Sequence, residues 1–81
     1  MFTKKKVDPR LRELRRLDAA VADNLQVAYY YAIIIAARVS EGEEQYPDEL
    51  SQFKDFHHEY LIHQERHHAL EMRLLREGVL S

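Results

Sequence analysis

All five histidines of the 81-residue chain lie between His57 and His68. Imidazole and carboxylate groups are good ligands for zinc, iron, nickel and copper. His63, His67 and Glu71 follow one another at intervals of four residues, so in a helix successive pairs share one face and can reach one ion. His57 falls in the same sector of a helical wheel. The sequence therefore offers a metal site made of His57, His63, His67 and Glu71, with a transition metal (Zn, Fe, Ni or Cu) as its cofactor.

The same cluster has two other interpretations, of which a structural role is the leading one. Buried polar side chains cost free energy unless they are paired, but paired ones can fix register and oligomeric state. His63 can pair with Glu59 and His67 with Glu71, and the preceding helix can supply further polar partners. The third interpretation is a pH-sensitive switch, because an unperturbed histidine titrates at about 6.5.

The chain carries little else that could perform chemistry. It has no cysteine, which excludes disulfides and thiolate metal sites. With two glycines it has no phosphate-binding loop, and its serines lie near expected helix ends or at the terminus. An acid–base reaction at His67 and Glu71 would need a pocket, which the sequence does not show. Enzymatic activity stays open, and the pattern favours a protein without a catalytic residue.

Two prolines and two glycines divide the chain into two long helices. Asp8 with Pro9 is a strong helix start, and Pro47 followed by acidic residues is another. Gly42 and Gly78 can end the helices in the left-handed conformation. The expected order is a disordered basic arm 1–7, helix 9–40, loop 41–47 and helix 48–77. Because the loop is short, the sequence predicts an all-α antiparallel hairpin, a single domain over 8–81.

Each expected helix carries an apolar stripe that should face the other helix. The stripe of the first helix comprises Leu11, Leu14, Leu17, Val21, Leu25, Ala28, Ala32, Ile35 and Val39. The stripe of the second comprises Leu50, Phe53, Phe56, Tyr60, Leu61, Leu74 and Leu75, with His57, Gln64, His67 and Glu71 in the same sector. The middle of the second stripe is therefore expected to be polar.

The first helix is apolar all round between Val27 and Ala37. The residues that project away from its stripe are Val27, Tyr30, Ile33 and Ile34, and a two-helix hairpin cannot cover them. Exposed apolar patches of this kind mark interfaces. We therefore expect a homodimer that completes a four-helix bundle, or a protein partner. The predicted function is an interaction or adaptor module, with a metal-binding bundle as the alternative.

Charge is distributed unevenly along the chain. Residues 1–40 carry eight Lys and Arg against four Asp and Glu, and residues 41–81 carry four against ten. Folding back gives a rod with one acidic tip and one basic tip, so two rods packed antiparallel would match charge to charge. The basic tip comprises Lys4, Lys5, Lys6, Arg10, Arg12, Arg15 and Arg16. It could hold phosphate, but the net charge of −2 disfavours nucleic acid.

The longest apolar run is the eleven residues from Val27 to Ala37. A transmembrane helix needs about 20 such residues. The lysines near the N-terminus precede a charged amphipathic stretch rather than the apolar core of a signal peptide. We therefore expect a cytoplasmic protein without a membrane span.

Overall fold

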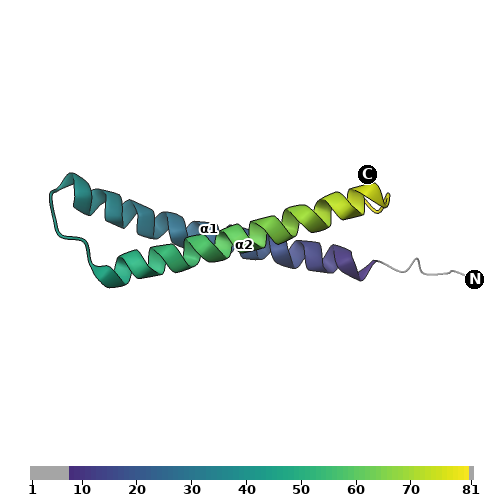
Figure 1. Cartoon of the computed structure of the whole chain (residues 1–81), viewed down its shortest axis with the longest axis horizontal. Helices are drawn as coiled ribbons and strands as arrows, with labels where there is room; N and C mark the ends of the chain where they lie inside the picture. The colour runs from purple at the N-terminus through teal and green to yellow at the C-terminus, as the bar shows by residue number, and fades with distance from the viewer. Residues whose placement is uncertain (1–7, 81) are drawn as a thin grey trace, which may run out of the picture.

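The computed structural model describes residues 8–80, which form two long helices packed against each other (Figure 1). Helix α1 spans Pro9–Ser40 and helix α2 spans Pro47–Arg76. The described residues contain no strand, and the predicted all-α hairpin is confirmed. The predicted arm 1–7 lies outside the described residues.

Both helices begin where a proline occupies the first helical position. At the start of α1, an Asp8 carboxylate oxygen accepts a hydrogen bond of 2.9 Å from the backbone N–H of Arg10. This is the interaction of an N-cap residue, which satisfies an otherwise unpaired donor. At the start of α2, Tyr46 makes no such side-chain bond, and two acidic residues in the first turn interact favourably with the helix dipole.

Both helices end at a glycine, as the sequence predicts. Gly42 and Gly78 have φ of 71° and 74°, which only glycine adopts without strain. The backbone N–H of Val79, the residue after Gly78, donates to Leu74 O at 2.9 Å, and the matching bond after Gly42 is 2.8 Å. These are Schellman motifs, which close the last turn of a helix. The motif at Gly42 is followed by a short connection, after which α2 runs back along α1.

Three contacts across the hairpin share one register. Arg10 bonds Glu77, the Tyr31 ring stacks on Phe56 at 6.1 Å, and Arg38 bonds its α2 partner Glu49. Twenty-one residues separate the first and second contacts on each helix, and seven separate the second and third. A seven-residue step in both helices is the repeat of an antiparallel coiled coil.

The contact line between the helices, called the seam below, follows from this register at alternating steps of three and four residues. On α1 it comprises Arg10, Leu14, Leu17, Val21, Asn24, Ala28, Tyr31, Ile35 and Arg38, all buried or half-buried. On α2 it comprises Glu49, Phe53, Phe56, Tyr60, His63, His67, Leu70 and Leu74, also buried or half-buried, and it ends at the more exposed Glu77.

The predicted stripe of α1 is wrong at two large apolar residues. Leu25 is 47% exposed and Val39 is 64% exposed. The seam instead uses the residues one position earlier, Asn24 and Arg38, and Tyr31 in the turn between them. Hydrophobicity alone favours Leu25 and Val39. The ion pair and the ring stack made by Arg38 and Tyr31 select the other phase.

The predicted stripe of α2 is wrong in the same way. Leu61 and Leu75 are exposed, and so are His57 and Gln64, which the helical wheel places in the core sector. The seam instead includes His63. A helical wheel drawn at 100° per residue drifts away from a seven-residue repeat, so it misassigns positions along a long helix. A supercoiled pair of helices keeps the seven-residue repeat along its whole length.

Few side chains are fully enclosed by this arrangement. Among the described residues the buried ones are Leu17, Ala28 and Leu74. Two helices in contact along one line leave most of each helix surface open, and small folds rarely reach useful stability on such a core. The hairpin therefore leaves much of its apolar surface uncovered.

Candidate functional site

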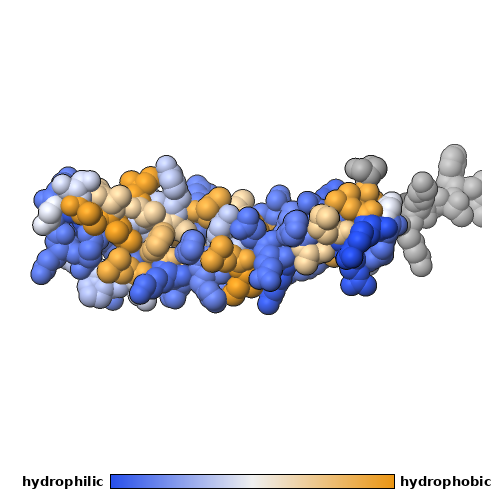
Figure 2. All heavy atoms as spheres, turned by 45° about the horizontal axis from the view of Figure 1, so that its top comes forward, coloured by the Kyte–Doolittle hydropathy of each residue, from blue (hydrophilic) through white to orange (hydrophobic). Residues whose placement is uncertain are grey.

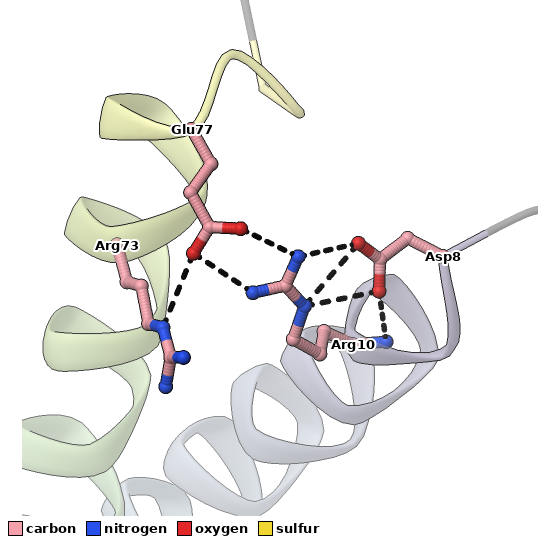
Figure 3. Close-up of polar contacts among 4 residues, drawn as sticks. All are labelled: Asp8, Arg10, Arg73 and Glu77. Carbon is pink, nitrogen blue, oxygen red and sulfur yellow. Dashed lines mark hydrogen bonds and ion pairs between the residues drawn. The ribbon is translucent and has the colours of Figure 1, made fainter.

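At the open end of the hairpin, away from the connection, an ion-pair network around Arg10 joins α1 to α2 (Figure 3). The Arg10 guanidinium donates to both Asp8 and Glu77, with shortest distances of 2.7 and 2.8 Å. Arg73 Nε adds a bond of 3.1 Å to Glu77. The hydrogen bond from Arg10 lowers the pKa of Asp8 from 3.8 to about 2, and it also lowers the pKa of Glu77.

The connection end is closed by a second network around Arg38. Its guanidinium donates to both carboxylate oxygens of Glu49, at 2.9 and 2.8 Å, and lies 4.0 Å from the centre of the Tyr46 ring. The hydrogen bond to Glu49 raises the pKa of Arg38. Sequence reasoning missed both networks, although each arginine occupies a heptad position opposite a glutamate.

The basic tip predicted from the sequence is partly neutralised. Arg10 bonds Asp8 and Glu77, and Arg16 forms an ion pair with Glu13. Arg12 and Arg15 are exposed and make no ion pair within residues 8–80. The three lysines of this tip lie outside the described residues.

The opposite tip keeps acidic groups that no cation of the described hairpin neutralises. Within this part of the chain, Glu41, Glu44 and Asp48 are exposed and make no ion pair. Arg38, the arginine at this end, is already bonded to Glu49 and lies 3.7 Å from Glu43. The exposed groups without an ion pair that lie nearest the two tips, Arg12 and Arg15 at one and Glu41, Glu44 and Asp48 at the other, therefore have opposite signs.

The histidines of α2 lie in different surroundings. His63 Nδ1 lies 2.7 Å from the backbone carbonyl oxygen of Glu59 and 3.7 Å from the Glu59 carboxylate, the partner predicted from the sequence. His67 Nε2 lies 3.8 Å from a carboxylate oxygen of Asp18, reaching across to α1 rather than to Glu71. His57 is exposed, and its ring stacks on a neighbouring aromatic ring of α2 at 5.7 Å.

The proposed metal ligands are only partly brought together. His67 and Glu71 line a shallow hollow of about 290 Å³ with Leu14, Arg15 and Asp18. Across the described 73 residues, no three His, Cys, Asp or Glu side chains are placed to hold a metal ion. A metal would therefore need ligands beyond those that one hairpin brings together.

Three large side chains in the middle of α1 are exposed rather than packed on α2. Tyr29, Tyr30 and Ile33 are 65%, 63% and 51% exposed. With Gln26 and Val27 they line an open hollow of about 400 Å³. These five residues are called the outer surface. Two residues of the interface predicted from the sequence, Tyr30 and Ile33, are exposed on it, and Val27 forms its half-buried edge.

The outer surface is flanked by small side chains on both sides. Ile34, the fourth residue of the predicted interface, is half-buried beside it. The exposed alanines at the flanks are Ala19, Ala22, Ala36 and Ala37, and the one charged residue from 19 to 37 is Asp23. Small side chains let a second helix approach closely. Figure 2 shows apolar residues spread over much of the half of the rod next to the connection.

A second apolar strip, called the side surface, runs along one flank of the seam. Asp18 of α1 and Glu71 of α2 line one hollow and therefore share a flank of the hairpin. In α1, residues at intervals of seven from Asp18 lie on the same flank. In α2, residues at intervals of three or four from Glu71 do so as well. The large apolar side chains exposed there are Leu25, Val39, Leu61 and Leu75.

Helix α1 contains a stretch long and apolar enough, by length and composition alone, to cross a membrane, and 6% of that stretch is buried in the hairpin. The helix that covers part of it, α2, carries charged residues along its whole length. Its first turn has Asp48 and Glu49 and its last turn has Arg73 and Arg76. The apolar stretch of α1 therefore packs against a strongly charged helix, α2.

No protein-family model, curated protein or solved structure matches the chain. The site is therefore defined by the chain's own chemistry: a seam closed by two ion-pair networks, and apolar surfaces on which no described residue packs. Of these surfaces, the outer surface has the largest exposed side chains.

Proposed function

We propose that this protein is a non-enzymatic interaction module that works as a homo-oligomer, with the outer surface of α1 as its binding face. The observation that carries the proposal is the exposure of Tyr29, Tyr30 and Ile33 beside an apolar hollow. Tyrosine is favoured at interfaces because it combines an apolar body with a polar tip. A second helix packed there would remove these side chains from water.

The small core gives a second argument for assembly. Hydrophobic burial contributes about 25 cal/mol per Å² of apolar surface, and one hairpin buries three side chains of its described residues. Association supplies the missing burial in small folds that have neither disulfides nor a metal. Two hairpins joined in this way contain four helices, which is the simplest closed form of the assembly.

A lipid bilayer is the competing environment for the same apolar stretch, and the ion-pair networks argue against it. Inserting α1 alone would break the bonds of Arg10 and Arg38 to α2. Inserting both helices would carry the charges of α2 into hydrocarbon, which costs several kcal/mol for each charge at the bilayer centre. A protein surface covers the outer face without either cost.

The test is the oligomeric mass of the full chain with Ile33→Asp. We expect the wild type to form dimers or larger assemblies in native mass spectrometry and light scattering. Ile33→Asp should give helical monomers, because a carboxylate would be desolvated in the interface. Ile33 is preferred to Ile34 for this test because it is more exposed, so its replacement disturbs the hairpin less.

Ala69→Asp is the matched control, since it adds the same charge at an exposed position of α2. It should leave the mass unchanged. A monomeric wild type, or an Ile33→Asp variant with the wild-type mass, would reject the proposal.

A metal-binding bundle is the second candidate, supported by the shared hollow of Asp18, His67 and Glu71. In an assembly, two such hollows could combine their ligands around one ion. Native mass spectrometry of protein purified without chelator measures this directly. A fixed mass of bound metal that is lost in His67→Ala would support the candidate, and a metal-free assembly would reject it.

A further inference from the structure

We propose that two copies of this chain pair through their α1 helices in antiparallel orientation, with the two-fold axis between Tyr29 and Tyr30. This inference rests on the proposed function, and it adds the identity of the partner and its direction. The partner of the outer surface is the outer surface of a second copy. An interface of this kind is isologous, so the same surface of each copy contributes to it.

The first support is the charge left free at the two tips. Arg12 and Arg15 are exposed and make no ion pair within residues 8–80 at one tip, and Glu41, Glu44 and Asp48 are in the same state at the other. A parallel pair would set like charges side by side. An antiparallel pair sets each basic tip against the acidic tip of the other copy, which gives complementary potentials.

The second support is the position of the outer surface between these charges. Arg15 and Glu44 are equally distant in sequence from the Tyr29–Tyr30 peptide, which lies in the centre of the outer surface. An axis at this point sets Ala19 of one copy level with Ser40, the last residue of α1, in the other copy, so that the Arg15 end of one copy lies beside the connection that carries Glu44 in the other. Apolar contact and charge matching are satisfied by the same alignment.

The third support is the size of the side chains on either side of the axis. In this alignment Ala22 of one copy lies level with Ala37 of the other, and Gln26 lies level with Ile33. All four are exposed and lie on the side of α1 away from α2. Small residues at the flanks let the helices approach, while the tyrosines and Ile33 fill the centre.

Directed cross-linking of cysteine variants tests the orientation, because the chain has no cysteine of its own. Ala22→Cys and Ala37→Cys chains are prepared separately, one of them isotopically labelled, and then mixed and oxidised. The expected product is the mixed disulfide, which joins one Ala22→Cys chain to one Ala37→Cys chain. Two chains of the same variant should cross-link poorly, since Ala22 lies about 22 Å along the helix from the level of its own counterpart.

A Glu65→Cys chain measures collisional cross-linking, since Glu65 is an exposed residue of α2. Disulfides formed mainly between two chains of the same variant would show parallel pairing, which overturns this inference while leaving self-association intact. An oligomer in which every combination of cysteine variants cross-links only as weakly as the Glu65→Cys chain would place the interface elsewhere, and it would also overturn this inference. A monomeric chain, or one that binds lipid vesicles as a monomer, would reject the proposed function as well.

A charge exchange gives an independent readout at the tips. Arg15→Glu and Glu44→Lys each replace attraction by repulsion in an antiparallel homodimer, so each should dissociate several-fold more readily at low salt. In the heterodimer of the two variants, position 15 of each chain meets the opposite charge at position 44 of the other, so both pairs of tips are attractive. We expect the heterodimer to exceed its statistical share several-fold in native mass spectrometry and to lose this preference at high salt. A statistical mixture at low salt would overturn the orientation.

Discussion

The two sides of α1 have opposite relations between polarity and burial. On the seam, polar residues such as Asn24 and Arg38 are half-buried against α2. On the other side, Tyr30 and Ile33 are exposed in an apolar stretch of the same helix. A chain that functioned alone would gain stability from the reverse arrangement.

The difference indicates that the two sides have different tasks. Polar groups on a coiled-coil seam reduce stability but define register, because a shifted alignment leaves them unpaired. The ion pairs of Arg10 and Arg38 fix both ends of α1 against α2. Apolar groups on the opposite side gain free energy only when another surface covers them. The seam therefore specifies the hairpin, and in our proposal the outer surface drives its assembly.

The largest expected effect tests whether the seam is the core. Leu74 is fully buried, with 0% exposure, so Leu74→Ala removes apolar contacts that cannot be replaced by water. We expect a loss of about 2–5 kcal/mol in the free energy of unfolding, measured by urea denaturation at fixed protein concentration. Met72→Ala, at an exposed position two residues away, should change it by about 0.5 kcal/mol. Equal losses would contradict the division of α1 and α2 into buried and exposed sides.

A smaller effect of opposite sign is expected at the polar centre of the seam. The Asn24 amide donates a hydrogen bond of 2.8 Å to the backbone carbonyl of Ala20. The shared register places Asn24 opposite His63. Asn24→Leu should raise the free energy of unfolding by about 1 kcal/mol through apolar burial. Spin labels on the two helices should report an unchanged distance distribution, because the Asn24 bond lies within α1 and the ion pairs of Arg10 and Arg38 keep the register.

Glu65→Leu is the control for this substitution, at an exposed position of α2 that adds the same side chain without burying it. A loss of stability in Asn24→Leu, with the control unchanged, would mean that the bond of Asn24 to Ala20 stabilises the hairpin more than apolar burial at this position does.

The smallest effect concerns acid stability of the open end. The pKa of Asp8 is lowered to about 2, so its ion pair stabilises the fold above pH 4 and is lost as the pH falls from about 4 to about 2. Urea denaturation across this range should show the loss in the wild type and a smaller loss in Arg10→Gln. Arg12→Gln, which removes an arginine without an ion pair in residues 8–80, should behave as the wild type does. The same pH dependence in all three would contradict a role for the network.

Local sequence signals determined the helices themselves. Pro9, Pro47, Gly42 and Gly78 predict where each helix begins and ends, and the structure agrees to within a residue. These signals act through the dihedral angles and hydrogen bonds of a few neighbouring residues, so no knowledge of the partner helix is needed. The apolar excess of α1 is equally visible in the chain, and it identified Tyr30 and Ile33 before any packing was known.

The phase of the seam was decided only by the tertiary structure. The sequence favours Leu25 and Val39 as core residues by hydrophobicity, but the helices meet one position earlier, at Asn24 and Arg38. That choice depends on what lies opposite, since Arg38 meets Glu49 and the aromatic rings of both helices stack in the same register. A helix presents several usable faces, and the partner that best satisfies one of them determines which is buried.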